Sequence, residues 1–211
     1  MARSDRSRSG RNGYDRKDVY HQRAKAEGFR SRAAYKLQEI QERAKLLKRG
    51  QRVVDLGCWP GGWLQVASGI VGPRGRVVGI DIAAVDPPIE YENVFSIQGD
   101  FTEVPVLEAV IGELGALADC VISDAAPKLT GIRVADRARE EACLEAIEAT
   151  LSPLLRPGGS FLAKLLECPE AHDFELRIKK RFDESRALKT KATRKGSSER
   201  YLIARGFRPD A

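Results

Sequence analysis

Short runs of apolar residues recur along the chain, and their spacing changes from one segment to the next. The apolar side chains of residues 31–48 recur at helical spacing, which predicts an amphipathic helix with Ser31 as its N-cap and Gly50 after its last turn. Beyond it, five nearly continuous runs rich in β-branched residues predict strands that are buried on both faces of a parallel sheet. These runs are residues 52–57, 76–82, 94–100, 119–124 and 159–166.

Segments that can form helices separate these runs, the clearest being residues 136–154. Two further strands are predicted at residues 184–190 and 199–207, and we expect them to form an antiparallel pair at the edge of the sheet. Strands that alternate with helices predict an α/β fold. We expect a doubly wound, mostly parallel sheet of seven strands with an antiparallel edge strand and right-handed crossovers.

The first predicted strand leads into a glycine-rich turn, VVDLGCWPGGW, at residues 53–63. Glycines such as Gly57 and Gly61 at the carboxyl end of a strand let the backbone approach a ligand closely. Their spacing fits neither the dinucleotide fingerprint nor the P-loop. The next two strands end in Asp81, which is placed to accept hydrogen bonds from ribose hydroxyls, and in Asp100. Acid-lined walls attract a sulfonium and repel phosphate, so this edge predicts a site for S-adenosyl-L-methionine.

The fourth predicted strand ends in SDAAP, which carries Asp124. Methyltransferases that act on exocyclic base amines usually have Asp/Asn-Pro-Pro and an aromatic residue here, to hold a flipped base. Those that act on pyrimidine C5 need a cysteine nucleophile, often in the order Pro-Cys. The one cysteine beside a proline is Cys168, which follows the next strand in the order Cys-Pro. Both reactions are therefore disfavoured.

Lys164 lies among apolar neighbours in the fifth predicted strand, FLAKLL. A lysine inside a buried strand is costly unless it is paired or neutral, although its amine can also reach solvent at the strand end. We expect Lys164 to lie near the same sheet edge as Asp124. A neutral amine held by a carboxylate can accept a proton from an alcohol, so these residues permit methyl transfer to a hydroxyl group.

Charge is segregated along the chain, whose formal net charge is +6. Residues 1–50 hold 15 Lys and Arg against 6 Asp and Glu, residues 51–170 hold 9 against 18, and residues 171–211 hold 12 against 6. Clustered basic residues neutralise phosphates, so the two basic ends predict a face that binds nucleic acid, with a merely solvated surface as the alternative. Residues 1–18 are expected to be a disordered basic arm, and residues 19–211 a single folded domain.

The composition, with 42% hydrophobic and 31% charged residues, is that of a soluble globular protein. The N-terminus lacks the apolar core of a secretory signal, and no apolar run approaches the roughly 18 residues of a membrane span. The four cysteines show neither CxxC pairing nor close spacing, which disfavours a zinc site and a disulfide scaffold. We expect a cytoplasmic monomer that needs neither a membrane nor a metal.

Taken together, the motifs resemble the FtsJ/RrmJ (RlmE) family of ribosomal RNA 2′-O-ribose methyltransferases, over nearly the whole chain. They are RSRAAYKLQEI (30–40), VVDLGCWPGGW (53–63), IQGDF (97–101), SDAAP (123–127), PGGSFLAK (157–164) and SSERYLIA (197–204). The resemblance implies that residues 19–211 form a Rossmann-like class I methyltransferase domain that uses S-adenosyl-L-methionine. It also implies 23S ribosomal RNA as the substrate, at a uridine in the A-loop of the large ribosomal subunit.

The family surrounds its target hydroxyl with a Lys-Asp-Lys-Glu tetrad. The resemblance assigns these catalytic roles to Lys36, Asp124, Lys164 and Glu199, with Lys164 as the general base. From the glycine turn and the resemblance together, the cofactor-binding residues are Gly57, Gly61, Trp63, Asp81, Asp100 and Asp124. Candidate RNA contacts are Arg30, Arg32, Lys36, Arg194 and Lys195. Tyr201 is compatible with a place in the core or near the target ribose.

The chain departs from the family pattern at three places. Cys58 and Trp59 stand where members commonly have two alanines, and Ala-Ala-Pro-Lys follows Asp124 where Met-Ala-Pro-Asn is frequent. Lys164 is followed by Leu-Leu-Glu-Cys rather than Phe-Gln-Gly. These differences concern the fit of cofactor and substrate. Two alternatives are the same reaction on tRNA or an RNA cap, and a ribosome-assembly factor that does not need catalysis; the intact tetrad disfavours the latter.

Overall fold

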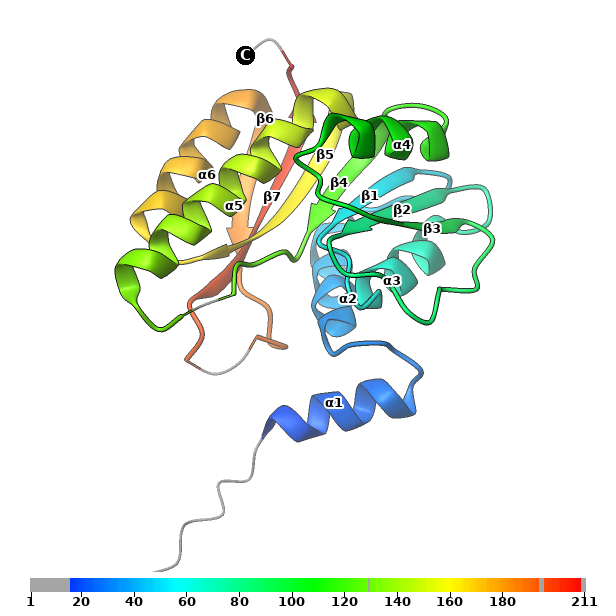
Figure 1. Cartoon of the computed structure of the whole chain (residues 1–211), viewed down its shortest axis with the longest axis horizontal. Coiled ribbons are helices and arrows are strands. Elements are labelled where there is room, and N and C mark those ends of the chain that lie inside the picture. The colour runs from blue at the N-terminus through cyan, green and yellow to red at the C-terminus, as the bar shows by residue number, and fades with distance from the viewer. Residues whose placement is uncertain (1–15, 129, 194–195, 210–211) are drawn as a thin grey trace, which may run out of the picture.

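The structure is a computed structural model that describes residues 16–128, 130–193 and 196–209. Within them, one mixed sheet has helices on both faces (Figure 1). Its strands are β1 (Arg52–Leu56), β2 (Arg76–Asp81), β3 (Val94–Gln98), β4 (Ala118–Ser123), β5 (Leu155–Leu166), β6 (Phe182–Leu188) and β7 (Glu199–Phe207). The helices are α1 (Arg16–Ala26), α2 (Ala33–Ala44), α3 (Gly62–Val71), α4 (Val104–Leu114), α5 (Arg133–Leu154) and α6 (Pro169–Arg181).

The strand order across the sheet is β3-β2-β1-β4-β5-β7-β6. Strands β1 to β5 are parallel, and β7 runs antiparallel to both of its neighbours, β5 and β6. The chain winds outward from β1 to β3 and then returns to β4 on the other side of β1. Open α/β sheets bind ligands at such a reversal, outside the carboxyl ends of the strands. The predicted doubly wound, mostly parallel sheet and the pairing of its last two strands are confirmed.

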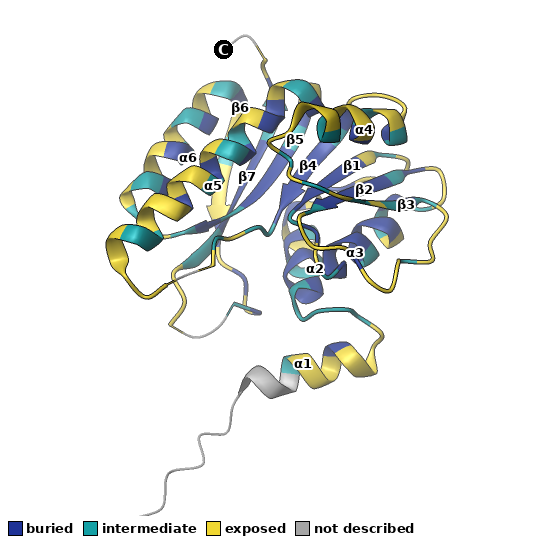
Figure 2. Ribbon diagram, in the orientation of Figure 1, coloured by how far each residue is buried: buried dark blue, intermediate teal, exposed yellow. Residues whose placement is uncertain are grey.

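Two apolar layers hold the helices against the sheet, and Figure 2 shows the strands buried between them. On one face, α4, α5 and α6 pack over side chains that include Phe161 and Phe174. On the other face, α2 and α3 pack through side chains that include Leu37 and Leu64. Strands covered on both faces need apolar residues at successive positions, which explains the continuous runs in the sequence.

Helix α2 is shorter than the helix predicted at residues 31–48. Its N-cap position lies one residue after Ser31 and has no side-chain hydrogen bond, so the expected cap is wrong. The helix ends where Lys45 adopts the left-handed conformation, with φ 49°, and donates its backbone N–H to the Gln41 carbonyl. The Gln41 side chain then bonds to both backbone groups of Leu47, at 2.9 and 2.8 Å. These bonds stabilise a non-helical segment whose leucines are buried in the core.

Some expected boundaries also shift. The predicted arm spans residues 1–18; residues 1–15 lie outside the described part of the chain, and residues 16–18 belong to α1. Helix α5 begins three residues before its predicted start, at Arg133. In the described ranges, no helix combines the length and apolar character needed to cross a membrane.

Candidate active site

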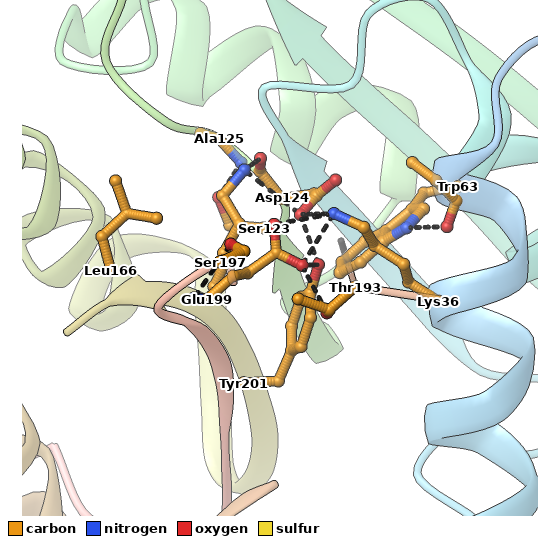
Figure 3. A network of polar contacts seen from close by, with 12 residues as sticks. Lys36, Trp63, Ser123, Asp124, Ala125, Leu166, Thr193, Ser197, Glu199 and Tyr201 are labelled. Atoms are coloured by element: carbon orange, nitrogen blue, oxygen red, sulfur yellow. Dashed lines mark hydrogen bonds and ion pairs between the residues drawn. The ribbon is translucent and has the colours of Figure 1, made fainter. Parts of the chain in front are cut away.

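Four charged side chains from distant segments meet at the carboxyl edge of the sheet. Figure 3 labels three of them, Lys36, Asp124 and Glu199. Lys36 comes from α2, Asp124 follows β4, Lys164 lies on β5 and Glu199 begins β7. Lys36 Nζ lies 2.9 Å from each carboxylate oxygen of Glu199 and 3.8 Å from Asp124 Oδ1. Lys164 Nζ lies 3.3 Å from Asp124 Oδ1 and also donates to the Asp124 backbone carbonyl. The structure thus brings the four predicted catalytic residues together.

The antiparallel register of β7 on β5 makes this meeting possible. Leu166 pairs with Glu199, and Lys164 pairs with Tyr201. The start of β7 therefore lies beside the carboxyl end of β5, where the parallel strand β4 also ends. Because side chains two positions apart point to the same face of a strand, Glu199 and Tyr201 project together.

Tyr201 joins this cluster, a place that the sequence left undecided. Its side chain is buried, and its hydroxyl oxygen lies 2.7 Å from Asp124 Oδ1 and 3.1 Å from Glu199 Oε1. Burial and then the two neighbouring carboxylates raise the pKa of Tyr201 well above its usual value. The phenol therefore stays protonated, and its O–H can donate to either of the two carboxylates, which lie on both sides of it. The sequence signal that could have indicated this position is the Glu-x-Tyr spacing, which places Glu199 and Tyr201 on the same face of a strand.

Glu199 is held from a second side by Thr193, whose hydroxyl donates to Glu199 Oε1 at 2.9 Å. Burial alone would raise the pKa of Glu199, but the charge and hydrogen bond of Lys36, together with the Thr193 bond, lower it below its usual value. Glu199 is therefore ionised and forms a charge-assisted pair with Lys36. Sequence reasoning missed Thr193, which lies in the segment between β6 and β7.

A cavity of about 400 Å³ opens beside the tetrad. Its wall includes Gly57 after β1, Asp81 at the end of β2, Phe101 after β3, and two of the predicted catalytic residues, Asp124 and Lys164. The cavity thus lies across the point where the sheet reverses its winding. Lys164 is the tetrad lysine that forms part of this wall, whereas the Lys36 amine is turned into the pair with Glu199.

The turn after β1 is shaped for close approach. Gly57 has a φ of +75°, and a Cβ there would lie 2.6 Å from the Ala125 side chain. The N–H groups of Gly57 and Cys58 both donate to the Ile80 carbonyl, at 2.8 and 3.1 Å. Gly61, with a φ of +105°, donates to the Cys58 carbonyl at 2.7 Å and precedes α3. Only glycine suits both left-handed positions, and the turn is fixed against β2.

The predicted cofactor residues do not all reach the cavity wall. Asp81 does, and its carboxylate accepts from the backbone N–H groups of Trp59 and Ala83, each at 2.9 Å. Asp100 instead closes a turn on Thr102, at 2.9 and 2.8 Å, and its side chain is not part of the wall. Each Asp81 oxygen retains a free acceptor site, so Asp81 can still bind ligand hydroxyls.

Gly61 and Trp63 also lie away from the wall. Gly61 is covered by Ile89 and Arg30, the nearest side chains to where its Cβ would be. Trp63 is buried, donates its indole N–H to the Ala33 carbonyl at 2.9 Å, and packs 6.0 Å from Tyr201 between ring centres. Its side chain therefore joins α3 to α2 beneath the tetrad. As direct cofactor contacts, these two residues stay predictions.

Asp55, on β1, is the buried acid of the site. It is 1% exposed, and neither of its carboxylate oxygens has a hydrogen-bond partner among the described residues. Burial, then the charges of Asp124 and Asp81, raise the pKa of Asp55 well above its usual value. Three acidic side chains thus gather around the glycine turn. Of these, Asp81 and Asp124 line the cavity, and they fit a ligand with a positive centre and ribose hydroxyls, as S-adenosyl-L-methionine has.

The predicted RNA contacts have structural partners as well. The Arg30 guanidinium donates to the Pro88 carbonyl at 2.8 Å and to the Pro60 carbonyl at 3.4 Å. Arg32 donates to the Ala192 carbonyl at 3.4 Å, which links the start of α2 to the segment before β7. Lys36 belongs to the tetrad. The remaining two predicted contacts, residues 194 and 195, lie outside the described residues.

Known proteins resemble this chain in sequence and in fold. Residues 29–207 match the FtsJ-like methyltransferase family. A protein of Methanothrix thermoacetophila named "Ribosomal RNA large subunit methyltransferase E" is 44% identical over 191 residues, which are 90% of this chain and 73% of the relative. A protein of the same name from Syntrophobacter fumaroxidans is 44% identical over 195 residues, 92% of this chain and 98% of the relative.

The solved structures agree with this assignment. The crystal structure of a protein described as a ribosomal RNA methyltransferase, from Plasmodium falciparum, superposes with a TM-score of 0.73 at 26% identity. The match covers 85% of this chain and 98% of that one. The chain therefore belongs to the FtsJ-like methyltransferase family, whose methyl donor is S-adenosyl-L-methionine.

Proposed function

We propose that this protein transfers a methyl group from S-adenosyl-L-methionine to a ribose 2′-hydroxyl of 23S ribosomal RNA, at a uridine in the A-loop of the large ribosomal subunit. The observation that carries the proposal is the assembled Lys36, Asp124, Lys164 and Glu199 tetrad at the edge of an acid-lined cavity. Relatives with the same name over nine-tenths of the chain support the ribosomal substrate.

The reaction needs a group that removes the hydroxyl proton, because a ribose hydroxyl is barely ionised at neutral pH. When bound, S-adenosyl-L-methionine supplies an electrophilic methyl group. In its neutral form, Lys164 Nζ accepts the proton of the hydroxyl, since Lys164 is the tetrad lysine in the cavity wall. Asp124 orients the Lys164 amine through its carboxylate and its backbone carbonyl.

The rest of the tetrad holds this pair in place. Lys36 faces Glu199 and Asp124 and adds a positive charge beside the reacting oxygen. Tyr201 donates between the two carboxylates and so fixes their separation. Holding the hydroxyl and the amine in a reactive orientation makes the step effectively unimolecular, which lowers its entropic barrier. On the cofactor side, Asp81 accepts hydrogen bonds from the ribose hydroxyls, and the glycine turn lets the backbone approach the cofactor closely.

The RNA phosphates would be bound by the basic ends of the chain, through Arg32 and the residues near it. Phosphate contacts position an RNA without reading its sequence. We place the reaction in the cytoplasm and expect the chain to act as a monomer. Because the acidic central segment contains the cofactor cavity, charge steers RNA to the rim rather than into the cofactor site.

The test is to map 2′-O-methylation on ribosomal RNA from cells with the gene, without it, and with only Lys164→Ala. Loss of one A-loop methylation in both altered strains is expected. Unchanged ribosomal RNA methylation in the deletion strain would contradict the proposal, and a loss on tRNA or a cap would redirect it. If the deletion impairs subunit assembly and Lys164→Ala restores it, the protein has an assembly role apart from catalysis.

A further inference from the structure

Trp59 is the most unusual side chain of the cavity. It is a large aromatic residue, yet 58% of it is exposed, whereas the second tryptophan of the chain, Trp63, is 3% exposed. Trp59 lies in the cavity wall together with Asp81 and Lys164. Exposed apolar surface of this size within a binding cavity indicates a ligand contact.

The backbone beneath Trp59 is fixed. Its N–H donates to Asp81 Oδ2 at 2.9 Å, and the preceding residues Gly57 and Cys58 are bonded to the Ile80 carbonyl. The Trp59 backbone is therefore held beside the Asp81 carboxylate, which is expected to bind ribose hydroxyls. A ring held by a rigid turn loses little conformational entropy when a ligand packs on it.

Two other apolar side chains share this end of the cavity. Ile82, which follows β2, is 76% exposed, and Phe101, which follows β3, is partly buried. Strands β2 and β3 lie on the side of β1 opposite to β4, β5 and β7, which position three of the tetrad residues, Asp124, Lys164 and Glu199. The cavity therefore has an apolar end beside Asp81 and a charged end at Asp124 and Lys164.

We propose that Trp59 packs against the adenosine part of S-adenosyl-L-methionine and forms a wall of its site. With the ribose hydroxyls on Asp81, the adjoining adenine falls at the apolar end, next to Trp59 and Ile82. The sulfonium then lies toward Asp124 and Lys164, where the methyl group is needed. Purine rings stack on indoles because both are flat and polarisable. The inference concerns cofactor binding and does not depend on which RNA is methylated.

Tryptophan fluorescence of the full chain, titrated with S-adenosylhomocysteine, reports on this contact directly. We expect a saturable change in the wild type and its loss in Trp59→Phe, in which Trp63 is the remaining tryptophan. Calorimetry should show that Trp59→Ala weakens binding about tenfold or more, while Trp59→Phe recovers most of the affinity. Leu176→Ala, which changes an exposed residue on α6, is the matched control and should bind as the wild type does.

The choice of ligand tells which part of the cofactor Trp59 touches. If it touches adenosine, Trp59→Ala weakens S-adenosyl-L-methionine, S-adenosylhomocysteine and 5′-methylthioadenosine by similar factors. A loss confined to S-adenosyl-L-methionine would mean a contact with the sulfonium and would overturn the assignment to adenosine. Unchanged cofactor affinity with weaker binding of A-loop RNA would overturn it in favour of an RNA contact. Unchanged affinity for both would remove Trp59 from the site.

Discussion

The two halves of the carboxyl edge of the sheet differ in how their charged side chains are paired. In the catalytic half, formed by α2, β4, β5 and β7, each lysine faces a carboxylate of the same protein: Lys36 faces Glu199, and Lys164 faces Asp124. In the cofactor half, formed by the ends of β1 to β3, Asp81 is held by backbone N–H groups. The oxygens of Asp55 have no partner among the described residues.

This difference separates two kinds of organisation. A site whose charges are already paired is preorganised, so its groups need little rearrangement during the reaction. In the cofactor half the acids have no cationic side chain as a partner within the described ranges, so Asp81 is left available to a ligand, and the pKa of buried Asp55 is raised. We therefore expect changes in the catalytic half to affect turnover, and changes in the cofactor half to affect ligand affinity and the pH dependence of stability.

The largest effect is expected at Lys164. Lys164→Ala should retain the fold and cofactor affinity but lower turnover by about 10²- to 10⁴-fold, the scale of a general base. Lys164→Arg should fail as well, because a guanidinium stays protonated. Single-turnover methylation of ribosomal particles, with calorimetry of cofactor binding in parallel, measures both quantities. An active Lys164→Arg enzyme would show that Lys164 serves only as a charge.

The next effect is expected at Asp81. Asp81→Ala should weaken S-adenosyl-L-methionine binding by about 1–3 kcal/mol, because the ligand hydroxyls lose their acceptor. Asp81 also accepts from the Trp59 N–H, and Asp81→Asn, which keeps one acceptor oxygen without the charge, shows how much of the loss is due to the charge. Calorimetry of both variants is the measurement. Wild-type affinity in Asp81→Ala would exclude Asp81 from the site.

Asp55 should make stability depend on pH. Its pKa is raised in the folded protein, so the folded state holds a proton that the unfolded state releases above pH of about 4. The stabilising contribution is complete below that pH and is lost as pH rises through the raised pKa. Relative to Asp55→Asn, the wild type should lose up to about 1.4 kcal/mol per pH unit in this window. Urea unfolding at several pH values measures this, and parallel pH profiles for the two proteins would contradict it.

The smallest loss of turnover is expected for Glu199→Ala. Lys36 keeps Asp124 as a partner at 3.8 Å, and Tyr201 can still donate to Asp124. Removing one positioning interaction should lower turnover by roughly tenfold, about 1.4 kcal/mol, and leave cofactor affinity unchanged. The same single-turnover assay applies. A loss as large as that of Lys164→Ala would assign Glu199 a direct part in proton transfer.

The sequence predicted the sheet better than it predicted the site. Continuous apolar runs identify strands that are covered on both faces, and this pattern can be recognised without knowledge of tertiary contacts. The end of α2 could not be predicted, because it depends on a side-chain bond from Gln41 to Leu47. The tetrad was found through family resemblance, since Lys36 and Glu199 are 163 positions apart.

Individual roles at the cofactor edge were harder to predict. The motifs indicate that Trp63 and Asp100 lie near the turn and the strand end, but not that one side chain faces the core and the other closes a local turn. The place of Tyr201 was left undecided and the full burial of Asp55 was not predicted, because both depend on neighbours on other strands. Local patterns do not contain that information.

The insertion of β7 between β5 and β6 has a consequence for the order of folding. In the described residues, β6 joins the sheet only through β7, so β6 cannot take its place before β7 does. The strands around the cofactor cavity precede β7 in the chain, so they are synthesised before it. Glu199 and Tyr201 arrive with β7. The cluster around Asp124 is therefore complete only once β7 has joined the sheet.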